Sequence, residues 1–85
     1  MKMIFFSVAA FSYDKFIGHM PVRIFLTEQQ AKSILRMRDG IEFTVAELAD
    51  RASKEEWVGQ FAQELAKENC YNYDRISLVY YVINL

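Results

Sequence analysis

The chain has 85 residues, of which 53% are hydrophobic and 15% aromatic. This length allows a single domain, and the apolar composition excludes a disordered protein. The formal net charge of −1 excludes a protein that holds nucleic acid mainly through its phosphates, because that mode of binding needs a clear excess of lysine and arginine.

Two apolar segments at the N-terminus predict a β-hairpin. Residues 3–13 are rich in strand-forming side chains, and a polar break at residues 13–15 separates them from a second apolar run, residues 16–26. Proline lacks the N–H that a central strand donates to its neighbour. Because of Pro21, we expect the second strand to lie at a sheet edge or to begin near Val22.

Three N-cap signals divide the middle of the chain into three predicted helices. Residues 27–30 (Thr-Glu-Gln-Gln) fit a capping box and begin a helix that we expect to end at Gly40. A second box at residues 44–47 begins a short helix. A third, at residues 53–56, begins the longest helix, which we expect to run to about Glu68.

The C-terminal segment, residues 76–85, predicts a strand that is apolar on both faces. Strand periodicity places Ile76, Leu78, Tyr80 and Val82 on one face, and Val79, Tyr81, Ile83 and Leu85 on the other. Strands of this kind are usually buried on both sides.

The sequence therefore predicts one α+β domain over residues 1–85, in the order strand, strand, helix, helix, helix, strand. We expect a three-stranded antiparallel sheet with the helices packed on one face. Three short helices cover only one face, so the other face should be left as an exposed apolar surface. Such surfaces usually mark interaction sites.

We accordingly expect a non-enzymatic protein-binding module that contacts another protein or a second copy of itself. The uncovered face or the edge of the last strand would be the contact surface. The residues expected on that face are Phe5, Val79, Tyr81 and Ile83, with Tyr71 and Tyr73 at its rim.

The chain offers little catalytic chemistry. His19 and Cys70 are its only imidazole and thiol, and a nucleophilic Cys–His pair would need a third group to orient it. Zinc would need three or four ligands. The carboxylate pairs Glu55/Glu56 and Glu64/Glu68 lie near the ends of a predicted helix, where we expect mainly solvated charges. We therefore expect no enzyme, no cofactor and no metal.

A sharper alternative is a DNA-binding regulator that uses residues 43–68. The segment from Phe43 to Leu65, a short helix, a turn at Ser53 and a longer helix, resembles the winged helix-turn-helix family. That resemblance implies DNA reading by the longer helix. The segment departs from the family pattern, because Ser53 replaces the usual turn glycine and the reading helix would begin with two glutamates, which repel phosphates.

Charge is unevenly distributed along the chain. Residues 1–38 carry six basic and two acidic side chains, whereas residues 39–85 carry four basic and nine acidic ones. In size, acidity and lack of a catalytic set, the chain resembles small phage-encoded inhibitors of host defence complexes, such as anti-CRISPR proteins. This likeness is of general type and rests on no motif. It implies that an acidic helical face could occupy a basic groove of the target. That face would comprise Glu47, Asp50, Glu55, Glu56 and Glu64.

A single cysteine cannot form an internal disulfide, so we expect a cytoplasmic protein. Lys2 and the apolar run that follows it faintly imitate a signal peptide, but cleavage after Ala10 would remove the predicted first strand. The longest nearly uninterrupted apolar run, residues 3–11, is far below the roughly 20 residues that span a bilayer. We therefore expect no membrane association.

Overall fold

A computed structural model describes residues 1–37, 41–68 and 71–85 of the chain. The predicted N-terminal hairpin is present, with β1 at Lys2–Ser12 and β2 at Lys15–Leu26. Tyr13 and Asp14 form the two-residue turn and have φ angles of 50° and 64°. Positive φ at both central positions is typical of the type I′ turn, whose twist matches that of the paired strands.

The sheet has four antiparallel strands in the order β2-β1-β4-β3, so the prediction of three strands is wrong. β4 (Arg75–Asn84) pairs with β1 along its length, and the additional strand β3 (Ile41–Thr44) pairs with the first part of β4. A strand of four residues gives too short an alternation to be recognised in the sequence. The edge position predicted for the proline-containing strand is confirmed, because β2 is an outer strand.

Three helices are present, as predicted: α1 at Glu28–Leu35, α2 at Val45–Ala52 and α3 at Glu56–Glu68. Both capping boxes at the starts of α1 and α2 form. The hydroxyl of Thr27 accepts the Gln30 N–H at 3.2 Å, and the hydroxyl of Thr44 accepts the Glu47 N–H at 3.1 Å. The predicted end of the first helix, Gly40, lies outside the described residues.

The prediction that a third capping box at Ser53 begins the last helix is wrong. Ser53 is the C-cap of α2, and its hydroxyl donates to the carbonyl of Asp50 at 2.7 Å. α3 begins three residues later, at Glu56. A serine near a helix boundary can satisfy groups on either side of it, so the same four-residue pattern fits the end of one helix as well as the start of the next.

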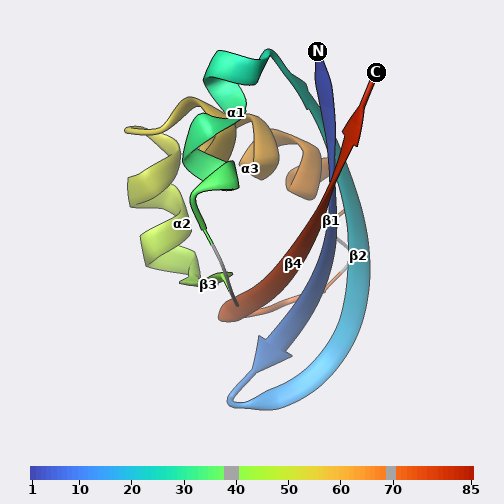
Figure 1. Cartoon of the computed structure of the whole chain (residues 1–85). Helices are drawn as coiled ribbons and strands as arrows, with labels where there is room; N and C mark the ends of the chain where they lie inside the picture. Colours follow the sequence, from blue (N-terminus) through green and yellow to red (C-terminus); the bar gives the residue numbers. More distant parts are fainter. Residues whose placement is uncertain (38–40, 69–70) are drawn as a thin grey trace.

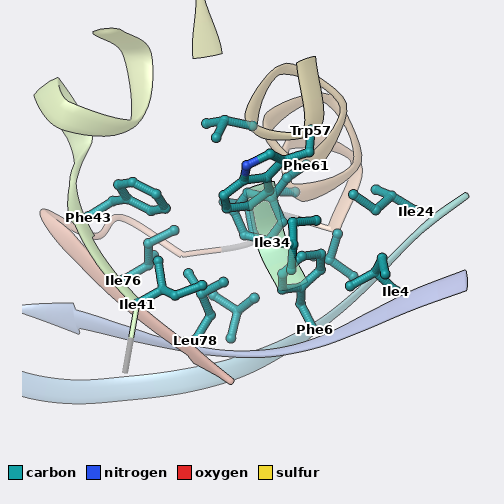
Figure 2. Close-up of a cluster of buried hydrophobic side chains, with 14 of the residues drawn as sticks. Ile4, Phe6, Ile24, Ile34, Ile41, Phe43, Trp57, Phe61, Ile76 and Leu78 are labelled. Carbon is teal, nitrogen blue, oxygen red and sulfur yellow. The ribbon is translucent and has the colours of Figure 1, made fainter. Parts of the chain in front are cut away.

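The hydrophobic core lies between the helices and one face of the sheet (Figure 2). Alternate residues of β1, Ile4, Phe6, Val8 and Ala10, are fully buried there. The ring of Phe6 stacks on Trp57 of α3 at 5.9 Å between centroids and meets Phe61 edge-on at 4.9 Å. An aromatic cluster thus fixes α3 on the sheet.

All three helices lie on the concave side of the curved sheet (Figure 1). The inner face is the one that points toward them. On the other, convex face, no described helix or strand covers the sheet (Figure 1). The expected one-sided α+β arrangement is therefore present, with the outer face of the sheet left open.

Candidate protein-binding surface

The outer face carries a cluster of apolar side chains at one end of the sheet. In the pairing of β1 with β4, Phe5 lies beside Tyr81, Met3 beside Ile83 and Ser7 beside Val79. In the pairing of β1 with β2, Met3 also lies beside Phe25. The rings of Phe5 and Tyr81 are 6.5 Å apart between centroids. We define the outer patch as the six apolar residues of this cluster: Met3, Phe5, Phe25, Val79, Tyr81 and Ile83.

The outer patch is substantially open to solvent. Tyr81 is 62% exposed, Val79 and Phe25 are each 53% exposed, and Ile83 is 44% exposed. Met3 and Phe5, on the central strand β1, are half-buried between them. A half-buried centre, here Met3 and Phe5, surrounded by exposed aliphatic and aromatic groups is the arrangement expected of an interaction site.

Polar side chains border the patch on the same face. Arg23 of β2 lies beside Phe5 in the register, and His19 lies further along the same strand. Toward the other end of the sheet, Arg75 pairs with Glu42 at 2.7 Å, and its guanidinium stands 4.3 Å from the centroid of the Phe11 ring. The outer face therefore carries both an apolar cluster and charged side chains.

The structure brings together four of the residues predicted for this face: Phe5, Val79, Tyr81 and Ile83. Sequence reasoning missed Met3 and Phe25. The signal for Phe25 was present, since it alternates with the buried Ile24 and Leu26 of β2.

The two tyrosines predicted at the rim lie elsewhere. Tyr71 and Tyr73 are half-buried and pack against the core. The ring of Tyr71 lies close to Gly18. A Cβ atom added to Gly18 would stand 2.4 Å from Cζ of Tyr71. Burial raises the pKa of the Tyr73 hydroxyl above its ordinary value of 10.0. Both rings precede β4, at the end of that strand away from Tyr81.

The five acidic residues predicted as a contact face are largely engaged with neighbours. Asp50 pairs with Lys54 at 3.2 Å, Glu64 pairs with Lys67 at 2.9 Å, and Glu55 pairs with Arg51. The other two also have partners: Glu56 accepts a hydrogen bond from Gln30 at 2.8 Å, and Glu47 closes the α2 capping box. Local ion pairs reduce the field that these carboxylates present to a basic groove.

The helix pair α2–α3 does not favour the DNA-binding alternative. α3 buries Trp57, Val58, Phe61 and Leu65 against the rest of the molecule. Its charged residues are three glutamates and one lysine, an arrangement that repels a phosphate backbone. The helix that would read DNA is thus an acidic helix held on the sheet.

His19 is exposed on the outer face, and its ring lies 4.9 Å from that of Phe16. Cys70, its proposed partner in a nucleophilic pair, lies outside the described residues. Within residues 1–37, 41–68 and 71–85, no group of three or more His, Cys, Asp or Glu side chains could hold a metal ion.

The hollows on the described surface include two that are lined in part by carboxylates. One, of about 330 Å³, is lined by Phe5, Pro21, Val22, Arg23, Glu64 and Glu68. The other, of about 540 Å³, is polar and lies between the start of α1 and the α2–α3 turn, with Trp57 among its lining residues. The indole N–H of Trp57 is buried and has no acceptor among the described residues.

Among the described residues, no helix is long and apolar enough to cross a bilayer. No protein-family model, curated protein or solved structure gives a significant match to this chain.

Proposed function

We propose that the protein is a small, non-enzymatic protein-binding module and that the outer patch is the surface that contacts its partner. The observation that carries this proposal is the open apolar face of the sheet, where four large hydrophobic side chains stand between 44% and 62% exposed on the two strands that flank β1. A partner that covered these side chains would gain about 25 cal/mol of binding free energy for each Å² of apolar surface removed from water.

The chemistry of the patch suits protein recognition. Tyr81 and Phe5 provide aromatic rings, the side chains that most often dominate the binding energy of an interface. They stand on paired strands, so little conformational freedom is lost when a partner covers them. The neighbouring Arg23 and the Arg75–Glu42 pair would form a polar border that restricts which partners fit.

The partner that fits this proposal is a protein or nucleoprotein complex with a complementary apolar surface. By its general likeness to small phage-encoded inhibitors, the module would block such a complex by covering part of it. The single cysteine suits a reducing compartment, so we place this activity in the cytoplasm.

Two matched tyrosine substitutions test the proposal. Tyr81→Asp puts a charge in the outer patch, whereas Tyr13→Asp puts the same charge in the hairpin turn, where the side chain is 92% exposed. Wild-type protein and both variants would serve as baits in extract of the source cells, and binding of an apolar dye would be measured in parallel.

We expect the wild type and Tyr13→Asp to retain the same partner and to bind the dye, and Tyr81→Asp to lose both. Circular dichroism should show that all three are folded. Equal capture by the two variants would contradict the proposal, because the partner would then bind a surface other than the outer patch.

A further inference from the structure

Among the residues that the structure describes, the second half of β4 is an open sheet edge. β3 pairs with β4 only from Arg75 to Leu78, whereas β1 pairs with it as far as Asn84. Beyond Leu78, β4 therefore has a described neighbouring strand on one side only. We define the open edge as residues 79–84 of β4.

Two hydrogen bonds show which backbone groups face this edge. The N–H of Leu85 donates to the carbonyl of Met1 at 3.2 Å, so the odd-numbered residues of β4 direct their backbone groups to β1. On the other side, the N–H of Val45 donates to the carbonyl of Asp74 at 3.0 Å, so the even-numbered residues face β3. The N–H and carbonyl of Val82 and Asn84 therefore point toward the open edge.

The sequence at this edge lacks the features that usually prevent strand pairing. Natural proteins protect edge strands with charged residues, proline or bulges. The other outer strand, β2, carries Lys15, Pro21 and Arg23. Residues 79–85, Val-Tyr-Tyr-Val-Ile-Asn-Leu, contain no charge and no proline. A strand without charge can lie beside an identical strand without like charges meeting.

We propose that a second copy of this chain pairs with the open edge, so that β4 lies antiparallel to the β4 of its partner with Val82 opposite the partner's Val82. The two four-stranded sheets then form one continuous sheet of eight strands. In this register the backbone N–H and carbonyl groups of the even-numbered residues of the two copies point toward each other. Val82 meets its counterpart, and Asn84 meets the partner's Tyr80, in hydrogen-bonded pairs.

The register follows from two constraints. Pairing centred on Tyr81 would place the partner's Asn84 opposite Leu78, a position that Ile41 of β3 already occupies. Centring on Val82 avoids that overlap. It also places Tyr81 opposite the partner's Ile83 and Val79 opposite the partner's Leu85, which are favourable apolar pairs on the outer face.

The same arrangement brings opposite ends of the two α1 helices toward each other. The hydroxyl oxygen of Tyr80 lies 2.7 and 2.6 Å from two carbonyl oxygens at the end of α1, where Lys32 is in the last turn. Asn84 accepts a hydrogen bond from Lys2, which lies 3.6 Å from Glu28 in the first turn. Because Tyr80 opposes the partner's Asn84, the end of α1 that carries Lys32 in one copy approaches the Lys2–Glu28 ion pair at the start of α1 in the other.

This inference goes beyond the proposed function, because it concerns the edge of β4 and the proposed function concerns the face of the sheet. Pairing of one short strand buries less surface than a standard protein interface. The dimer should therefore be weak and should depend on concentration.

The first test uses the wild-type protein. Sedimentation velocity from about 1 μM to about 1 mM should show a monomer giving way to a dimer. In a mixture of isotope-labelled and unlabelled protein, NMR should give contacts between Tyr81 and the partner's Ile83. A monomer over the whole range would overturn the proposal, as would a dimer whose contacts lie elsewhere.

A pair of variants separates the edge from the face. Val82→Pro removes an N–H that points to the open edge while the odd-numbered residues keep their bonds to β1. Phe25→Asp charges the outer patch two strands away. We expect Val82→Pro to weaken the dimer at least about tenfold and Phe25→Asp to leave it intact.

For the partner protein of the proposed function we expect the reverse, with capture lost in Phe25→Asp and retained in Val82→Pro. A folded Val82→Pro variant that dimerises like the wild type would overturn the edge proposal alone. If Val82→Pro does not fold, the wild-type contacts between Tyr81 and the partner's Ile83 decide the question.

Discussion

The turn between β1 and β2 places two ordinary residues in a region of φ that usually favours glycine or asparagine. Tyr13 has a φ of 50° and Asp14 a φ of 64°. The left-handed conformation costs most residues about 1–2 kcal/mol, and asparagine and aspartate tolerate it best. The Tyr13 side chain is 92% exposed, so its replacement should lose little packing.

Tyr13→Asn should therefore stabilise the protein by about 0.5–1 kcal/mol and raise its melting temperature by roughly 2–8 °C. Thermal unfolding followed by circular dichroism measures this change. Tyr13→Val is the control, since a β-branched side chain disfavours positive φ and should lower the melting temperature. A Tyr13→Asn variant that melts below the wild type would show that the turn differs from the one described.

Individual residues of the outer patch could be predicted where strand alternation was continuous. Val79, Tyr81 and Ile83 alternate with Leu78, Tyr80 and Val82, and the structure keeps that alternation. Tyr71 and Tyr73 could not be placed in this way. They precede the strand in an irregular segment, whose packing against the core depends on tertiary contacts such as the one with Gly18.

At the scale of the elements, local capping chemistry predicted where two helices begin. The Thr27 and Thr44 boxes depend on contacts within four residues, so the sequence alone contains what they need. β3 could not be predicted by such reasoning. Its four residues become a strand because Ile41 and Phe43 pair with Leu78 and Ile76 of β4, far away in the sequence.

The two hydroxyl residues at the boundaries of α2 should differ in their effect on stability. Thr44→Ala removes an N-cap and should lower the free energy of unfolding by about 1 kcal/mol. Ser53→Ala removes one hydroxyl bond at an exposed helix end and should cost less than about 0.5 kcal/mol. Urea unfolding of both variants measures the difference. A larger loss in Ser53→Ala than in Thr44→Ala would contradict this assignment, because it would indicate that Ser53 is the N-cap of the third helix.

At the scale of the whole molecule, the three described helices cover one face of a four-stranded sheet, and no described element covers the other (Figure 1). The sequence predicted this asymmetry from the number and length of its helices, although it missed one strand. The outer patch follows from this asymmetry, whereas the open edge of β4 follows from the short length of β3. No described helix or strand of this chain covers either of them.

Two neighbouring tyrosines of β4 test this account most directly. Tyr80 points inward, where its hydroxyl reaches the end of α1 and its ring lies 6.2 Å from that of Phe6. Tyr81 points outward and is 62% exposed. The free energy of unfolding should fall by at least about 3 kcal/mol in Tyr80→Asp and by less than about 1 kcal/mol in Tyr81→Asp.

The measurement is urea unfolding of the two variants beside the wild type, at a protein concentration low enough to keep the chain monomeric. A large loss in Tyr80→Asp and a small one in Tyr81→Asp would agree with an open outer face. Equal, large losses would contradict the account, because Tyr81 would then belong to a buried core and the outer patch would not be free to bind a partner.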